Sequence, residues 1–129
     1  APVFLENYVP KAFELRVTVI GKQVFACRIN SQDSERTRDD WRRYDFSKVR
    51  HSPHDLPGDI HEKLIMLMGT LGIEFGAIDM IVTPEGQHIF LEVNPSGQWA
   101  WIEHLTNLPI SRAVAELLLN HVLCIKTRI

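Results

Sequence analysis

The chain has 129 residues, of which 45% are hydrophobic and 23% are charged, a globular composition that excludes collagen, a long coiled coil and wholesale disorder. Its formal net charge of -2 gives no global basic field for nucleic acid or an anionic membrane, so we expect it to bind neither. Two cysteines, Cys27 and Cys124, are too few for a disulfide scaffold and favour a reducing, cytoplasmic setting.

The N-terminal half begins with the pattern of a β-hairpin. Apolar and branched residues form two runs between residues 3 and 29, separated by the turn signal Gly21-Lys22. Residues 30–58 are polar and carry charges of both signs, as a solvated loop does. Loops of this length are usually functional or disordered, and the embedded Trp41, Tyr44 and Phe46 argue against disorder.

The C-terminal half alternates helices with strands. A capping box at Asp59 and Glu62 and apolar residues at helical spacing predict a helix that ends near residue 72. Residues 76–82 and 88–93 are typical of two strands joined by a turn, and a last helix is predicted near residues 111–123. These elements predict an α+β fold, in which an antiparallel sheet carries helices packed on one face.

The second predicted hairpin carries two carboxylates at matching positions. Because strand residues alternate between faces, His88, Phe90, Glu92 and Asn94 share one face, and residues 89, 91 and 93 share an apolar core face. Matching that core face with residues 78, 80 and 82 pairs Asp79 directly with Glu92, whether the loop has two or four residues. Like charges there destabilise a sheet by up to about 1 kcal/mol, so we expect a positive group between them.

Asp79, Glu92 and Asn94 together offer hard oxygen ligands from one face, which suit Mg²⁺ or Mn²⁺ rather than zinc. Mg²⁺ completes its octahedron with water and phosphate oxygens, so this set indicates a site for a metal and a nucleotide. The alternative is a carboxylate pair that shares a proton or is held by a nearby Arg or Lys. Spacing alone leaves both interpretations open.

The first hairpin raises the opposite question, because it contains two arginines. A two-residue loop would place Arg28 on the apolar face of the first strand, where an unpaired cation costs on the order of several kcal/mol. We therefore expect a three-residue loop with a bulge, which puts Arg16 across from Arg28. Facing guanidinium groups favour a phosphate between them. Glu14 offers the alternative of a surface ion pair with Arg16.

Several segments of the chain resemble, in order and spacing, the C-terminal part of an ATP-grasp ligase. The segments are ENYVPK (6–11), ELRVTVIG (14–21), Arg28, GAIDMIV (76–82) and FLEVNPSGQWAWIE (90–103). DWRRYD (40–45) and NPSGQWAWIEHLTNLPIS (94–111) are similar to the ATP-grasp maturases of microviridins and related graspetides. The resemblance extends from about residue 3 to about residue 122.

The resemblance implies a role for each matching residue. A hinge strand contacts adenine through its backbone, and an acidic residue, here Glu14, holds the ribose hydroxyls. Arg16 and Arg28 are expected near the transferred phosphate and the acyl phosphate. Asp79, Glu92 and Asn94 match the Mg²⁺ ligands, which agrees with the spacing of the hairpin. The hinge residues are Glu6, Asn7, Tyr8 and Val9.

The implied activity is an ATP-dependent carboxylate ligase. With ATP and Mg²⁺, or Mn²⁺ as an alternative metal, such an enzyme phosphorylates a side-chain carboxylate of a precursor peptide. An amine or hydroxyl then displaces the phosphate, which closes an amide or ester ring. The alternatives are a ligase of the glutathione synthetase or glutamate-adding type, and a non-catalytic module that binds a nucleotide or a peptide.

We expect residues 1–129 to be a fragment of a longer enzyme. The first ATP-grasp subdomain brings lysines and a glycine-rich loop to the phosphates, whereas the seven glycines of this chain are scattered. The chain would then be a C-terminal subdomain that supplies one wall of the ATP cleft, with little or no ligase activity alone. Homodimerisation of the full-length enzyme is left open.

Overall fold

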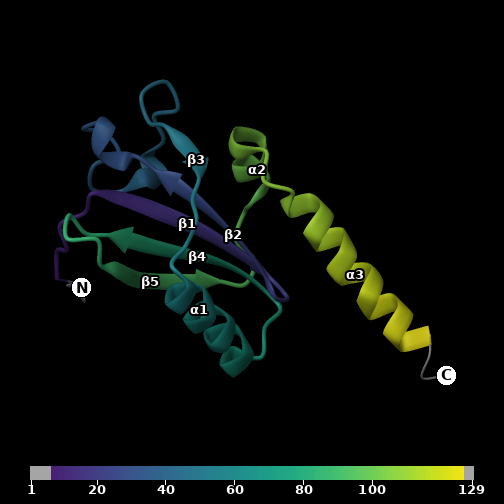
Figure 1. The fold of residues 1–129 in the computed structure, drawn as a ribbon. Coiled ribbons are helices and arrows are strands. Elements are labelled where there is room, and N and C mark those ends of the chain that lie inside the picture. The colour runs from purple at the N-terminus through teal and green to yellow at the C-terminus, as the bar shows by residue number, and fades with distance from the viewer. Residues whose placement is uncertain (1–6, 127–129) are drawn as a thin grey trace, which may run out of the picture.

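The computed structural model of the chain describes residues 7–126. Five strands form one sheet in the order β3-β2-β1-β4-β5, and all neighbouring strands are antiparallel (Figure 1). The elements are β1 (Phe13–Ile20), β2 (Gln23–Ile29), η1 (Ser31–Asp33), η2 (Trp41–Arg43), β3 (His51–Pro53), α1 (Gly58–Leu71), β4 (Phe75–Val82), β5 (His88–Asn94), α2 (Ala100–Thr106) and α3 (Ile110–Lys126). The predicted α+β fold with an antiparallel sheet is confirmed.

Helix α1 covers one face of the sheet. Alternate residues of β1 and β4 turn apolar side chains to this face, where Leu64 and Met68 of α1 pack on them. The helix ends as the sequence predicts, because Gly72 adopts a left-handed conformation with φ 67° and its N–H bonds to the carbonyls of the last turn. The strand residues in this core are Leu15, Val17, Val19, Ala26, Ile78, Met80 and Val82.

Helices α2 and α3 pack on the other face, so the helices cover both faces rather than the one expected. The reason lies in the strands: Ile20, Cys27 and Ile29 point away from α1 and need an apolar cover of their own. That cover contains Ile102 of α2 and Ile110 and Ala113 of α3, together with Trp41 and Val49 from the polar segment. The segment between β2 and β3 is therefore anchored by buried side chains, as its aromatic residues suggested.

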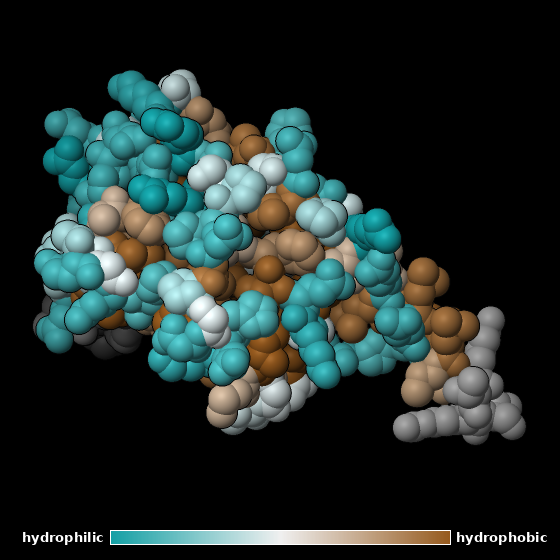
Figure 2. Space-filling model, viewed as in Figure 1, coloured by the Kyte–Doolittle hydropathy of each residue, from teal (hydrophilic) through white to brown (hydrophobic). Residues whose placement is uncertain are grey.

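The C-terminal part of α3 extends beyond the sheet (Figure 1). Apolar side chains gather on it, as the brown surface next to the grey terminus in Figure 2 shows, and Leu118, Leu119, Val122 and Leu123 are exposed. Across the described residues, none of the helices combines the length and the apolar character needed to cross a bilayer.

The first hairpin has a different register from the one predicted. Gly21 and Lys22 form a two-residue turn, so Arg28 pairs with Leu15, and Arg16 pairs with Cys27. The expected burial cost does not arise, because Arg28 lies near the end of β2 and is partly exposed. Its guanidinium carbon lies 3.8 Å from the centre of the Phe13 ring, and its Nε donates to Asn30 Oδ1 over 2.8 Å.

The second hairpin pairs Asp79 with Glu92, as predicted, but a β-bulge follows. Met80 then lies opposite Phe90, and Ile81 opposite Ile89, so Leu91 is an extra residue of β5. The predicted face assignment is therefore wrong for the first half of this strand. The strand can accommodate the bulge because β5 is an edge strand, where only one neighbour constrains the register.

Candidate functional site

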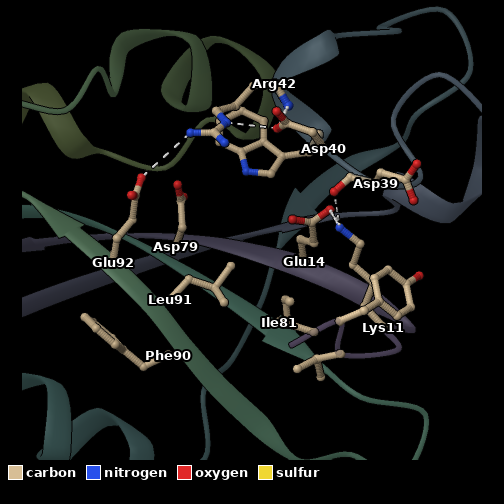
Figure 3. A pocket seen from close by; sticks show the side chains of 13 residues that line it. Lys11, Glu14, Asp39, Asp40, Arg42, Asp79, Ile81, Phe90, Leu91 and Glu92 are labelled. Carbon is tan, nitrogen blue, oxygen red and sulfur yellow. Dashed lines mark hydrogen bonds and ion pairs between the residues drawn. The ribbon is translucent and has the colours of Figure 1, made fainter. Parts of the chain in front are cut away.

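A cleft lies on the face of the sheet opposite α1. It contains a cavity of about 540 Å³ between the segment that enters β1, the segment before β3, and strands β4 and β5 (Figure 3). A second cavity of about 340 Å³ adjoins it and shares Trp41, Arg42, Asp79 and Glu92. The first cavity is lined by Tyr8, Val9, Lys11, Glu14, Asp39, Asp40, Trp41, Arg42, Asp79, Ile81, Phe90, Leu91 and Glu92.

Asp79 and Glu92 lie side by side at the boundary of the two cavities, on neighbouring strands. Asp79 is 5% exposed, and its Oδ1 accepts a hydrogen bond of 2.8 Å from Arg16 Nη1. Burial raises the pKa of Asp79, and the charge of Glu92 adds to this, while Arg16 acts in the opposite direction. Glu92 is exposed and lies 4.0 Å from Arg42 Nη1. The two carboxylates are therefore flanked by two guanidinium groups.

Arg16 is the buried cation of the site. Besides Asp79, its Nη2 donates to the carbonyl of Gln98 over 3.3 Å, and its guanidinium carbon lies 5.7 Å from the centre of the Trp41 ring. Its Nε is buried and has no hydrogen-bond partner within residues 7–126. Arg16 thus fixes Asp79 and connects β1 to the segment that follows β5.

Asn94 joins the two carboxylates on the same face, where it lines the second cavity. Its Oδ1 accepts hydrogen bonds from the N–H of Ser96 at 2.9 Å and from Ser96 Oγ at 3.3 Å. The predicted set of Asp79, Glu92 and Asn94 is brought together as expected. Within the described part of the chain no group of three or more His, Cys, Asp or Glu could hold a metal. Two carboxylates and an amide oxygen suit Mg²⁺, which takes its remaining ligands from water and phosphate.

The predicted hinge residues fall into three cases. Tyr8 and Val9 line the first cavity, whereas Asn7 is not among its lining residues. Glu6 lies outside the described residues. The hinge is therefore represented in the cleft by Tyr8 and Val9.

Glu14 forms part of the cavity wall and is 4% exposed. Its Oε1 accepts a 2.8 Å hydrogen bond from the ammonium of Lys11. Burial raises the pKa of Glu14, although the contacts with Lys11 and Ser31 act against this.

Arg28 is a predicted site residue that the fold places on the other face of the sheet. Its β2 position pairs with Leu15, which points to the α1 face, so its side chain lies on the other side of the sheet from Arg16. The structure therefore does not bring the two arginines together, and the separation follows directly from the two-residue turn.

The opposite wall of the cleft carries a cation, Arg42, which is not among the predicted nucleotide and metal ligands. Asp40 caps η2 by accepting from the N–H of Arg42 at 3.0 Å, and it also accepts from Arg42 Nε at 2.9 Å. Burial raises the pKa of Asp40, but the hydrogen bonds from Arg42 outweigh it and the pKa is lowered overall. An Asp two residues before an Arg in an aromatic-rich loop is the signal that indicates such a capped turn.

Leu91, which was predicted on the core face, belongs to the apolar floor of the first cavity. Ile81, Phe90 and Leu91 line it, and Leu91 reaches it because the bulge makes it the extra residue of β5 (Figure 3). An uninterrupted alternation would place Leu91 in the core, so no periodicity in the sequence could have assigned it to the cleft.

Solved structures similar to this chain are peptide-modifying ATP-grasp enzymes. Macrocyclase MdnC from Microcystis aeruginosa MRC, bound with the precursor peptide MdnA, is 46% identical with a TM-score of 0.74, over 87% of this chain and 34% of MdnC. A RiPP-associated ATP-grasp ligase from Chryseobacterium gregarium, in complex with ADP and a leader and core peptide, is 38% identical with a TM-score of 0.80, over 88% and 34% of the two chains. Macrocyclase MdnB from Microcystis aeruginosa MRC is 37% identical with a TM-score of 0.71, over 88% and 40%.

No protein-family model matches the chain, and no curated protein is similar to it. The chain spans about a third of the length of MdnC and of the Chryseobacterium ligase. Its resemblance to the ATP-grasp enzymes of peptide maturation is confirmed, and its fold is that of one part of an ATP-grasp ligase.

Proposed function

We propose that this chain is the C-terminal subdomain of an ATP-dependent ligase that modifies a ribosomally made precursor peptide. The observation that carries the proposal is the cleft, in which Asp79, Glu92 and Arg16 lie next to the cavity lined by Glu14, Tyr8 and Val9. In this proposal residues 1–129 are a fragment, and the missing subdomain supplies the other wall of the cleft. The similarity to MdnC and to the Chryseobacterium ligase supports it.

The first cavity would receive the nucleoside. Ile81 and Leu91 provide an apolar surface for a purine ring, while the backbone of the hinge at Tyr8 and Val9 can bond to the edge of the base. The Glu14 carboxylate in the cavity wall would accept from the ribose hydroxyls. A bound ADP in the similar Chryseobacterium ligase supports a nucleotide in this fold.

Asp79, Glu92 and Asn94 would hold Mg²⁺, with Mn²⁺ as the alternative ion. When bound, the metal would offset the charge of the phosphates during phosphoryl transfer. Arg16 keeps Asp79 in place through the 2.8 Å bond, and its positive charge would offset negative charge on the transferred phosphate. Arg28 takes no part in this proposal, because it lies on the opposite face of the sheet.

The reaction would follow the chemistry of carboxylate ligases. A side-chain carboxylate of the peptide accepts the γ-phosphoryl group of ATP, which gives an acyl phosphate and ADP. An amine or hydroxyl of the same peptide then attacks the carbonyl carbon and expels inorganic phosphate, which leaves an amide or an ester. The bound precursor peptide of MdnC supports a peptide as the substrate.

Binding of Mg-ADP to the complete protein that carries this chain tests the proposal. Asp79→Asn and Glu92→Gln should each abolish Mg-dependent binding in calorimetry, since each removes a ligand charge but keeps the shape of the side chain. Glu85→Gln in the exposed β4–β5 turn is the matched control, and it should bind as the wild type does. Wild-type affinity in both site variants would overturn the metal assignment. The isolated fragment should show no ATP turnover.

A further inference from the structure

Lys11 contacts two walls of the cleft at once. Its ammonium donates to Glu14 Oε1 at 2.8 Å and to the backbone carbonyl of Asp39 at 2.9 Å (Figure 3). The side chains of Lys11 and Glu14 are each 5% exposed, so this is a buried ion pair rather than a surface contact. Both acceptors line the 540 Å³ cavity, and they are 25 residues apart in the sequence.

The first contact orients Glu14 and opposes its protonation. Burial alone favours the protonated carboxyl, and the charge of nearby Asp40 acts in the same direction. The hydrogen bonds from Lys11 and Ser31 and the charge of Lys11 oppose this change. Lys11 also orients the group, because its ammonium donates to Glu14 Oε1.

The second contact controls the position of the facing wall. The Asp39 carbonyl immediately precedes Asp40, Trp41 and Arg42, which all line the cavity. Trp41 is buried in the core under α2 and α3, but Asp40 and Arg42 are largely held by each other. A donor from the start of β1 therefore fixes this wall relative to the sheet.

We propose that Lys11 is a positioning residue for the nucleotide, which orients the Glu14 carboxylate and fixes the Asp39–Arg42 wall relative to the sheet. The inference rests on the proposed function and adds a residue to it. Lys11 acts through Glu14 and the Asp39 carbonyl and needs no contact of its own with the reacting phosphate.

The test is a double-mutant cycle on Mg-ADP affinity in the complete protein. Lys11→Met should weaken binding by about tenfold or more, because it leaves a buried carboxylate without its cation. Lys11→Met should cost less affinity in the Glu14→Gln background than in the wild type, since only the contact with the Asp39 carbonyl is then left to lose. Lys63→Met, which removes the exposed partner of Asp59, is the control and should leave the affinity unchanged.

A second readout does not depend on the nucleotide. The ¹³C carboxyl resonance of Glu14 should titrate at a higher pH in Lys11→Met than in the wild type, whereas Lys11→Arg should preserve the wild-type titration. The double variant has no buried unpaired charge, so its comparison with Glu14→Gln remains measurable if Lys11→Met is poorly folded.

The outcomes separate the inference from the proposed function. Wild-type affinity in Lys11→Met, additive losses in the cycle, or an unmoved Glu14 titration would each overturn the role of Lys11 while nucleotide binding stands. A wild-type protein that binds no Mg-ADP would overturn the proposed function itself.

Discussion

Gly97 is a position where a single methyl group should disturb the site. A Cβ added there would lie 2.4 Å from the Cβ of Ala77 and 2.8 Å from Arg16 Nη2. Ala77 is fully buried on β4 and cannot move aside, so the Gly97 backbone would have to shift by about 1 Å to restore an ordinary contact of 3.4 Å. The next residue, Gln98, provides the carbonyl that accepts from Arg16. Gly97→Ala should therefore displace Arg16, which donates a hydrogen bond to Asp79.

The expected cost follows from this overlap. Overpacking of a buried site typically costs about 1–3 kcal/mol, so the free energy of unfolding of Gly97→Ala should fall by about that amount in urea denaturation. Mg-ADP affinity should fall as well, because Arg16 positions Asp79. Gly69→Ala is the matched control: nothing lies within 4 Å of the added carbon in helix α1, and the change should stabilise the protein by about 0.5–1 kcal/mol.

A compensating change makes the reasoning refutable. Ala77→Gly removes the nearest obstacle, so Ala77→Gly/Gly97→Ala should recover part of the stability lost by Gly97→Ala, and the two effects should be strongly non-additive. If Gly97→Ala is as stable as the wild type, or if the double variant shows purely additive losses, close packing of the 94–99 segment against Arg16 is not what the protein requires.

Three further predictions concern buried and relocated groups. Burial raises the pKa of the Cys27 thiol to about 12, so in Cys124→Ser a thiol reagent at pH 8 should label Cys27 only when the protein unfolds, and rapid labelling of the native state would contradict this. Burial lowers the pKa of His51 from its ordinary 6.5, so its unfolded form takes up the proton first as the pH falls below 6.5. The free energy of unfolding of the wild type should therefore fall between pH 7.5 and 5.5 more steeply than that of His51→Asn. An equal pH dependence in the two proteins would refute this. Arg28→Met should cost about 0.5–1 kcal/mol through loss of its aromatic contact while Mg-ADP affinity stays at the wild-type value, and a loss of affinity without a loss of stability would return Arg28 to the site.

The pairing of Asp79 with Glu92 could be predicted because several constraints agree. A hairpin loop of two residues and one of four residues both pair Asp79 with Glu92. A slip by one residue would bury a carboxylate in the core. The structure has this pairing, and it also brings Asn94 to the same face. Local alternation therefore sufficed for the metal-ligand candidates, because all three lie within one hairpin.

The first hairpin was mispredicted for a reason that local alternation cannot reveal. The sequence reasoning assumed that one face of β1 and β2 is apolar and the other polar. In the structure both faces carry buried apolar side chains, because Ile20, Cys27 and Ile29 belong to a second core that includes residues of α2 and α3. The free-energy cost predicted for Arg28 assumed a fully buried, unpaired cation. Arg28 is only partly buried, and its guanidinium group lies over the Phe13 ring. Both errors come from tertiary contacts with distant segments.

Tertiary contacts with distant segments also explain why the cleft contains residues that were not among the predicted ligands. The Lys11–Asp39 bond joins residues 28 apart through a backbone carbonyl, which carries no side-chain signal in the sequence. The apolar floor depends on the bulge after Asp79, which reverses the side-chain parity of β5 between Glu92 and Phe90. Because of this reversal, one edge strand supplies a carboxylate and an apolar residue to adjacent parts of the same cleft. An unbroken strand would turn Leu91 into the α1 core, and the cavity would keep its charges and Ile81 but lose the apolar surface that Leu91 adds for a purine.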